Sequence, residues 1–311
     1  MMNTHNSPGN APPVASLSDV SVAFKSTTAL KAVTTSIEAG LIYGLIGRNG
    51  AGKTTMLSLL ASYRRPDNGH VAVNGGDPFE DAERMSRVHF VFARDVSDES
   101  DTVRETLEHC ARYRDGFDLD YAWKLAERFG LDPKKSLSEL SLGMQSAVNA
   151  IEGLASGAEL TMFDEVHHGM DPQSRKLFYE SLLERRETTQ RTFILSTHLV
   201  SEMAYLFDHV LILDRGALIV DEPYDLVAER GVTVTGPIDA VEAFARNREV
   251  IGKQTLANTA AYVVYGALSD EERREAAASG LELNAVPFQD LFIHLTAASD
   301  SQGETHANHQ N

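Results

Sequence analysis

The sequence contains a single cysteine and no long apolar run. Cys110 is the one thiol among 311 residues, which excludes an internal disulfide and fits a reducing compartment. We expect its side chain to behave as a small, half-buried apolar group. A membrane-spanning helix needs roughly 18–20 consecutive apolar residues, whereas the most apolar long stretch, residues 256–268, is shorter and is interrupted by Asn and Thr. Any role at a membrane must therefore come through a partner.

Basic residues are scarce relative to acidic ones. The chain has 28 Lys and Arg against 45 Asp and Glu, a formal charge of −17, and the acids are spread along its length. Non-specific nucleic-acid binding requires a basic surface, so a nucleic-acid partner is not expected. The 42% of hydrophobic and 7% of aromatic residues are ordinary for a globular protein, and the length allows a substantial core.

Short apolar segments at residues 41–47, 159–163 and 192–196 predict strands that are buried on both faces, as in a parallel sheet. Each is followed by a polar turn and then by a helical pattern, so the expected fold class is α/β. Between the first two, residues 79–155 carry helical periodicity and contain two expected helices.

The pattern changes after residue 230, where short strand-like and helical segments alternate. We predict a disordered lead-in at 1–15, a main domain at 16–230, a small α+β accessory domain at 231–298 and a disordered polar tail at 299–311.

The glycine-rich stretch GRNGAGKTT follows the first apolar strand and precedes a helical pattern. It fits G-x-x-x-x-G-K-[ST], in which glycines let backbone N–H groups turn inward around phosphate oxygens. The next helix adds positive charge at its start, the lysine reaches the β- and γ-phosphates, and the threonine hydroxyl binds Mg²⁺. The protein is therefore predicted to bind a nucleoside triphosphate. The predicted phosphate-binding residues are Gly47, Arg48, Asn49, Gly50, Ala51, Gly52, Lys53, Thr54 and Thr55.

Two acids follow the second apolar strand, in the stretch FDEVHHGMDP. The C-terminal ends of strands in an open α/β sheet line the ligand crevice, so Asp164 is predicted to hold Mg²⁺ with Thr54, directly or through water. Glu165 is placed to activate a water molecule for attack on the γ-phosphate. His198 ends the third strand, where it can hydrogen-bond to the γ-phosphate or orient the attacking water.

In this order the motifs resemble those of the ATP-binding subunit of an ABC transporter. The matched order covers about residues 16–230: the phosphate loop, LSLGMQ at 140–145, FDE, GMDP and STH. The resemblance implies ATP as the nucleotide and a P-loop NTPase core with a mostly parallel sheet, an antiparallel β subdomain and a helical signature subdomain at about 79–155. The closing segment VPFQDLFIHLT resembles the C-terminal extension of bacterial exporters of drugs, antibiotics or lipids.

The segment LSLGMQ resembles the family's signature motif, which begins Leu-Ser-Gly-Gly-Gln in its commonest form. Ser141 is expected to cap the following helix, so that Ser141 and Gly143 present an anion site facing outward. In the family this site completes the ATP site of a second subunit, and two chains enclose two nucleotides. Asp171 matches the loop that contacts the opposing subunit. Phe24 resembles the aromatic residue that stacks on adenine; the alternative is an ordinary apolar strand residue.

Some positions depart from the family pattern. Leu142 and Met144 alter the signature motif. Ala93 stands where the family has a glutamine that contacts Mg²⁺ and the attacking water and links the site to the membrane partner. Its methyl group can do neither, although Asp95 could substitute as a metal contact. The sequence thus supports ATP binding more strongly than fast, tightly coupled hydrolysis.

His167 and His168 raise the question of a zinc site. Adjacent histidines cannot readily both face one metal and no cysteine lies near, so zinc is not predicted. Both occupy the expected contact between subunits, and we hypothesise that their protonation tunes dimer closure.

The function expected from the resemblance is that of a transport-coupled ATPase. Lys53, Glu165 and His198 are the predicted catalytic residues. A second ATP-binding subunit and a transmembrane permease are the expected partners, with export as the direction and the inner face of the cell membrane as the location. One alternative is a nucleotide-gated regulatory module with weak hydrolysis, and another is a soluble ABC protein without a transport role.

Overall fold

The computed structural model describes residues 12–307, and the side chains of residues 12–297. The chain divides into two compact units. Unit 1 contains residues up to 198 together with 206–221, and unit 2 contains 199–205 and the chain from 222 onward.

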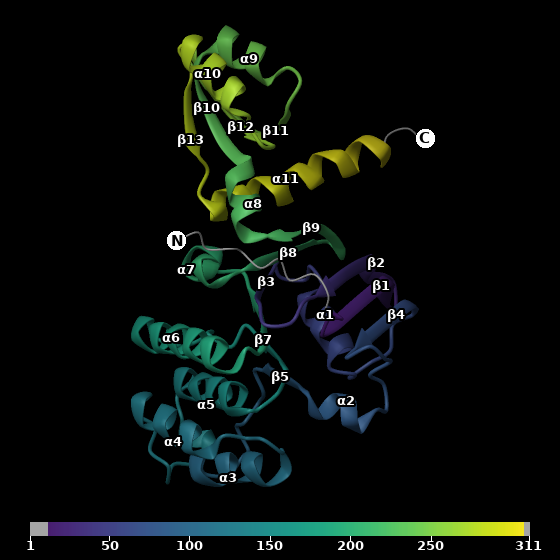
Figure 1. Ribbon diagram of the computed structural model, residues 1–311, viewed down its shortest axis with the longest axis vertical. Helices are drawn as coiled ribbons and strands as arrows, with labels where there is room; N and C mark the ends of the chain where they lie inside the picture. The colour runs from purple at the N-terminus through teal and green to yellow at the C-terminus, as the bar shows by residue number, and fades with distance from the viewer. Residues whose placement is uncertain (1–11, 308–311) are drawn as a thin grey trace, which may run out of the picture. The chain divides into compact units, whose positions relative to one another are not determined.

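Within the described residues, unit 1 is built around a sheet with the strand order β5-β6-β7-β3-β8-β9. Figure 1 labels β5, β7, β3, β8 and β9 of this sheet. The pairs from β5 to β8 are parallel. All residues of β3 and β7 are buried, which accounts for their almost wholly apolar sequences. The strands are β3 (Ile42–Ile46), β5 (Val88–Phe92), β6 (Leu160–Asp164), β7 (Thr192–Thr197), β8 (His209–Asp214) and β9 (Ala217–Pro223).

An antiparallel sheet of unit 1 has the order β2-β1-β4, with β1 (Ala15–Phe24), β2 (Thr27–Ile37) and β4 (Asn68–Val73). Helix α1 (Lys53–Leu60) buries Met56, Leu57, Leu59 and Leu60 in a core that also contains side chains from both sheets. This shared core holds the start of α1 at the end of β3, because only a short loop separates the two elements.

The remaining helices of unit 1 begin at residues that cap their first turns. Thr102 forms a capping box with Glu105, and Asp118, Ser141 and Asp171 each accept a hydrogen bond from the backbone three residues later. The helices are α2 (Ala82–Ser86), α3 (Val103–Tyr113), α4 (Leu119–Arg128), the 3₁₀ turn η1 (Leu137–Glu139), α5 (Leu142–Ala155) and α6 (Pro172–Thr189).

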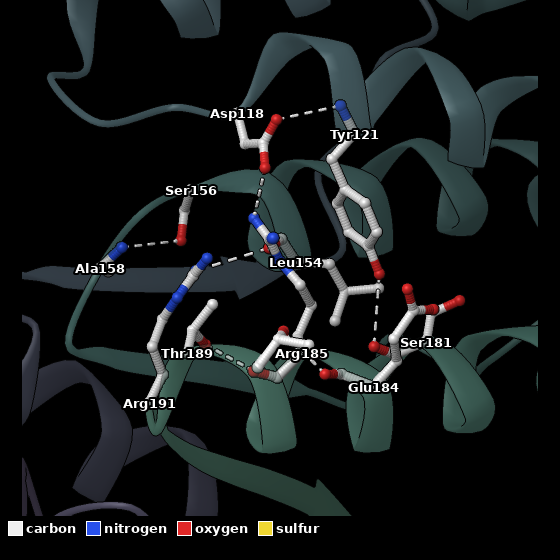
Figure 2. A network of polar contacts seen from close by, with 11 residues as sticks. Asp118, Tyr121, Leu154, Ser156, Ala158, Ser181, Glu184, Arg185, Thr189 and Arg191 are labelled. Atoms are coloured by element: carbon white, nitrogen blue, oxygen red, sulfur yellow. Dashed lines mark hydrogen bonds and ion pairs between the residues drawn. The ribbon is translucent and has the colours of Figure 1, made fainter.

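A polar network joins α4, the end of α5 and α6 (Figure 2). Asp118 accepts from the backbone of Tyr121 at 3.0 Å and receives Arg185 Nη2 at 3.0 Å. Arg185 also donates from Nε to the carbonyl of Leu154 at 3.1 Å, and its guanidinium lies 4.1 Å from the centre of the Tyr121 ring. Arg191 donates to the same carbonyl at 3.4 Å, and burial lowers its pKa to about 10. These contacts fix the C-terminal end of α5 relative to α6.

Unit 2 contains a βαββαβ arrangement followed by a helix. Its strands pair antiparallel in the order β11-β12-β10-β13, and α9 and α10 enclose an apolar core with the sheet. The elements are α7 (Val200–Met203), the 3₁₀ turn η2 (Ala204–Leu206) at the junction of the units, α8 (Tyr224–Arg230), β10 (Gly231–Pro237), α9 (Ile238–Ala245), β11 (Glu249–Leu256), β12 (Thr259–Tyr265), α10 (Asp270–Ala278), β13 (Glu282–Ala285) and α11 (Phe288–Ala307).

The ends of the predicted domains differ from those of the two units. Helix α8 lies in unit 2 rather than in the main domain, because its Tyr224 ring packs edge-on against Phe288 at 5.1 Å. The tail expected from residue 299 is helical as far as 307, since buried Phe288, Leu291 and Phe292 anchor the start of α11 and adding turns to an existing helix costs little. In the lead-in, β1 already begins at Ala15, and residues 1–11 lie outside the described residues.

Candidate active site

The phosphate loop, the two acids and the histidine lie at one end of adjacent strands. β6, β7 and β3 are neighbours, with Asp164 opposite Ser196 and Ile46 opposite Thr197. The residues that follow these strands include Gly47, Glu165 and His198. The parallel topology therefore brings together groups that are far apart in the sequence, at the edge where α/β proteins bind their ligands.

The phosphate loop is closed on one side and open on the other. Gly52 has φ 110°, and a Cβ there would lie 2.5 Å from the carbonyl oxygen of Ala29. Gly50 has φ 81° and nothing within 4 Å of an added Cβ. Arg48 and Asn49 are also exposed, whereas Ala51 is buried. Since Gly52 is the N-cap of α1, the first N–H groups of the helix point into the open side, which suits an anion.

Lys53 lies inside this cradle. The residue is 6% exposed, and its Nζ donates to the carbonyl of Gly47 at 2.8 Å. The same ammonium lies 3.3 Å from Oε1 of Glu165. A buried ammonium needs such acceptors, and here they hold it between the loop and the acid that follows β6.

Thr54 and Asp164 form the candidate metal site. The Thr54 hydroxyl donates to Asp164 Oδ2 at 2.6 Å. A hydroxyl and one carboxylate are hard oxygen donors, and Mg²⁺ characteristically takes one or two protein carboxylates and completes its shell with water and phosphate oxygens. In the described part of the chain, no group of three or more His, Cys, Asp or Glu side chains could hold a metal ion. The two oxygen donors, Thr54 and Asp164, fit Mg²⁺ bound together with a nucleotide.

Glu165 is held by two cationic or potentially cationic groups. Its Oε1 faces Lys53, and its Oε2 lies 3.1 Å from Nδ1 of His198. Burial raises the pKa of Glu165, but Lys53 and His198 together lower it by more. The pKa of Glu165 therefore lies below the ordinary value. The backbone of Glu165 has φ 51°, a left-handed conformation that costs energy in a residue with a side chain. The site thus holds an ionised carboxylate in a strained turn.

The two histidines of FDEVHHGMDP have different surroundings. His167 is 2% exposed, its Nε2 lies 3.5 Å from the Thr197 hydroxyl, and burial lowers its pKa to about 4. His168 is exposed. The hypothesis that both histidines tune closure at a subunit contact is wrong for His167, because its imidazole is buried beneath the turn and remains neutral near pH 7.

The start of α5 packs against the turn that follows Glu165. The Ser141 hydroxyl accepts from the backbone of Met144 at 3.4 Å, and a Cβ on Gly143 would lie 2.5 Å from the carbonyl oxygen of Gly169. Ser146 donates to the carbonyl of His168 at 2.6 Å. Only glycine at 143 permits this approach. The preceding residue, Leu142, is 56% exposed.

Asp171 and Phe24 contact other partners. Asp171 caps α6, and its carboxylate accepts from the backbone and the hydroxyl of Ser174 at 2.9 and 3.0 Å. Phe24 ends β1 and is 51% exposed, with the guanidinium carbon of Arg64 4.3 Å from its ring centre. Sequence reasoning missed Arg64, which belongs to no motif and has no local pattern.

Ala93 follows β5, whose last residue, Phe92, lies opposite Asp164. The next residue, Arg94, places Nη2 at 3.1 and 3.2 Å from the two carboxylate oxygens of Glu152. Asp95 accepts from the backbone of Ser97 at 3.0 Å, a local turn contact. The Arg94–Glu152 pair is a second feature that the sequence did not predict, since 58 residues separate its members.

Comparison with known proteins assigns the family. A family model described as "ABC transporter" matches residues 30–168. "Nod factor export ATP-binding protein I" of Burkholderia lata is 31% identical over 286 residues, which cover 84% of this chain and 90% of that protein. The chain belongs to the ABC transporter family. It is an ATP-binding subunit of that family and an ATPase.

Other relatives of this ABC ATP-binding subunit carry different transport names. "Bacitracin transport ATP-binding protein BcrA" of Bacillus licheniformis is 30% identical over 202 residues, covering 63% of this chain and 65% of that protein. "Methionine import ATP-binding protein MetN 2" of Pseudomonas aeruginosa is 31% identical over 209 residues, covering 64% and 62%. Family membership alone therefore leaves the direction of transport undecided.

Solved structures share the fold. An ATP-binding subunit of an ABC transporter superposes with a TM-score of 0.62 at 20% identity, covering 85% of this chain and 99% of that one. A dimeric ATP-binding cassette in a post-hydrolysis state, bound to ADP and phosphate, gives 0.59 at 21% identity, covering 68% and 98%. The predicted α/β fold, with its mostly parallel sheet and its antiparallel sheet, is confirmed.

Proposed function

We propose that this ABC ATP-binding subunit closes on a second ATP-binding subunit when ATP binds, reopens after hydrolysis, and thereby drives a separate membrane permease in the export direction. The observation that carries the proposal is the position of Glu165, whose carboxylate lies 3.3 Å from Lys53 Nζ and 3.1 Å from His198 Nδ1. This ionised acid stands at the same strand ends as the phosphate loop and the Thr54–Asp164 pair.

The residues divide the chemistry among them. Lys53 and the start of α1 bind the β- and γ-phosphates, and Phe24 stacks on the adenine. Thr54 and Asp164 hold Mg²⁺, which when bound supplies positive charge that offsets charge on the transferred phosphoryl group. Glu165 accepts a proton from the attacking water, and His198 keeps the carboxylate oriented and supports the transition state.

The proposal assigns the second nucleotide contact to the start of α5. Among the described residues, the contacts of Ser141 and Gly143 are with α5 itself and the 165–170 turn, and none is with the phosphate loop. Their polar groups at a helix start suit an anion held by another subunit. Asp171 would then lie in the same contact, and exposed Leu142 would meet the second subunit beside its nucleotide.

A separate permease and export are supported by the relatives. None of the helices in the described residues has the length and apolar character that a bilayer crossing requires. The relative named for Nod factor export covers 84% of the 311 residues of this chain. Because this coverage exceeds the 230 residues that precede β10, the similarity extends into unit 2. We therefore place the subunit on the inner face of the cell membrane, bound to its permease.

Phosphate release tests the enzymatic part of the proposal. The full chain should release phosphate from ATP with Mg²⁺, and Glu165→Gln, which keeps the shape and removes the charge, should abolish release while ATP binding is retained. Glu180→Gln, at an exposed side chain of helix α6, is the matched control and should have no effect. Recovery of a multi-span membrane protein with the full chain, purified from its own membranes, tests the permease part.

A second candidate function is a nucleotide-gated module with weak hydrolysis. Ala93 favours it, because its methyl group offers neither a metal ligand nor a hydrogen bond at the edge next to Asp164. The two candidates separate clearly. A rate that does not respond to Glu165→Gln, with the permease bound, would support the module and contradict the ATPase-driven mechanism.

A further inference from the structure

An ion pair connects the segment after β5 to helix α5. Arg94 Nη2 contacts both carboxylate oxygens of Glu152. Glu152 is 8% exposed, whereas the Arg94 side chain is 42% exposed. A buried carboxylate requires a counter-charge, and removing its partner is costly. The pair therefore ties a buried acid on α5 to an exposed arginine in the segment after β5.

Arg94 is the cation that serves Glu152, although Arg114 lies in the same region. Arg114 donates to the carbonyl oxygens of Ser156, Ser86 and Val88 at 2.8, 3.1 and 2.8 Å. Its guanidinium is thus committed to backbone acceptors. Both arginines and Glu152 line a cavity of about 340 Å³ beside β5.

The two ends of the tie lie next to different parts of the active site. Arg94 is two residues beyond Phe92, which is paired with Asp164. Glu152 belongs to α5, whose start packs through Gly143 on the carbonyl of Gly169 and whose Ser146 bonds to the turn after Glu165. Helix α5 therefore contacts the turn at 165–170 near its start and, through Glu152, the segment that follows β5.

We propose that Arg94 and Glu152 are positioning residues for ATP hydrolysis: their ion pair makes the loop at 93–97 and helix α5 move as one body, a coupling that Ala93 cannot provide through its own side chain. The inference rests on the proposed function, because α5 carries the surface assigned to the second subunit. Neither residue touches the nucleotide in this role. Their effect is on the placement of Asp164 relative to the start of α5.

The test compares two ion pairs at opposite ends of the same strands. Arg94→Met and Glu152→Gln, singly and together, remove the tie next to the active site. Arg87→Met and Glu159→Gln remove the pair at 3.4 Å that joins the residue before β5 to the residue before β6. Phosphate release by the full chain over a series of ATP concentrations with Mg²⁺ gives kcat and KM, and thermal melting reports stability.

We expect Arg94→Met and Glu152→Gln each to lower kcat about tenfold with KM unchanged within about twofold, the pattern of a lost transition-state arrangement. The kcat of the double variant should be no lower than that of the slower single variant, because each single substitution already removes the same ion pair. The Arg87 and Glu159 variants should retain the full rate. Equal rates in the Arg94 variant and the wild type, or a decrease in kcat that only parallels the melting temperature, would overturn the proposal.

Hydrogen exchange supplies a readout that a merely structural role does not change. On addition of ATP, the wild type should gain protection both at 93–97 and at the start of α5, whereas Arg94→Met should gain it at only one of the two segments. Joint protection in the variant would contradict the tie. If the wild type neither releases phosphate nor dimerises when ATP is added, the proposed function itself is wrong. If it does both and Arg94→Met is normal, this inference alone fails.

Discussion

Thr54 donates a hydrogen bond to Asp164 across 2.6 Å and so joins the first turn of α1 to the end of β6. The two residues are 110 positions apart, and the contact exists only because β3 and β6 flank β7 in one parallel sheet. It places a hydroxyl and a carboxylate where one small cation could be bound by both.

Replacing Asp164 by Asn tests this placement, because the amide keeps the shape and loses the charge. The affinity for ATP should become almost independent of Mg²⁺, and phosphate release should fall by at least about 100-fold, which corresponds to about 2.7 kcal/mol. Titration of ATP with Mg²⁺ or with EDTA measures the first effect. Exposed Asp115→Asn is the control. A Mg²⁺ effect that survives in Asp164→Asn would contradict the assignment.

Glu165 predicts how the rate depends on pH. Lys53 and His198 outweigh burial and lower its pKa, so the acid limb of kcat should lie below the range of an ordinary glutamate. His198→Asn removes one of the groups that lower this pKa. The acid limb should therefore move to higher pH in the variant. A pH–rate profile of the full chain decides the matter, and an unshifted acid limb would show that Glu165 is not the group that titrates.

His167 predicts a loss of stability in acid. The folded side chain remains neutral down to about pH 4, whereas an unfolded imidazole protonates near pH 6.5, so the unfolded state binds more protons between these values. Stability should therefore fall by about 2 kcal/mol between pH 7 and pH 5 through this group alone. His167→Gln should remove that part of the loss in denaturant unfolding curves, and exposed His168→Gln should not. An identical pH dependence of stability in the wild type and both variants would refute this role of His167.

Gly143→Ala tests the packing of α5 on the turn at 165–170. The added methyl group would come within 2.5 Å of the Gly169 carbonyl oxygen, and the two segments would have to separate. We expect a loss of about 1–3 kcal/mol in unfolding free energy and a rate lower than the stability loss explains. Met144→Ala, one residue further along, should leave the rate within about threefold. A normal rate in Gly143→Ala would separate α5 from the chemistry.

Cys110 should resist alkylation in the folded protein. Burial, reinforced by the nearby Glu152 carboxylate, raises the pKa of its thiol to about 12, so almost no thiolate exists at pH 8. Mass spectrometry after treatment with iodoacetamide should find the native chain unmodified and the denaturant-unfolded chain modified. Rapid modification of the native chain would require an opening of α3.

The sequence predicted the features that depend on local patterns. The apolar runs before Gly47, Asp164 and His198 marked buried parallel strands, and their shared edge followed from topology rules. Side-chain contacts between distant positions were not predictable in this way. The Arg94–Glu152 pair spans 58 residues, and nothing in the order of residues distinguishes buried His167 from exposed His168.

Boundaries were the other part that local patterns could not supply. Helix α8 reads as the end of the main domain, yet its Tyr224 contacts Phe288, a partner that only the folded second unit provides. The polar tail lacks apolar periodicity, but its residues as far as 307 extend a helix whose beginning is buried. In both cases a tertiary contact outweighs weak local preference.

The carbonyl oxygen of Ala29 lies beneath two glycines from different segments: a Cβ on Gly52 would reach it at 2.5 Å and one on Gly216 at 2.7 Å. Gly216 also donates to Ala51 and accepts from Lys31 through its backbone. A side chain at either glycine would require β2, which contains Ala29, to move away from both segments. Across diverging relatives these two positions should therefore accept change together or remain fixed together, and a library that randomises one of them alone should return glycine.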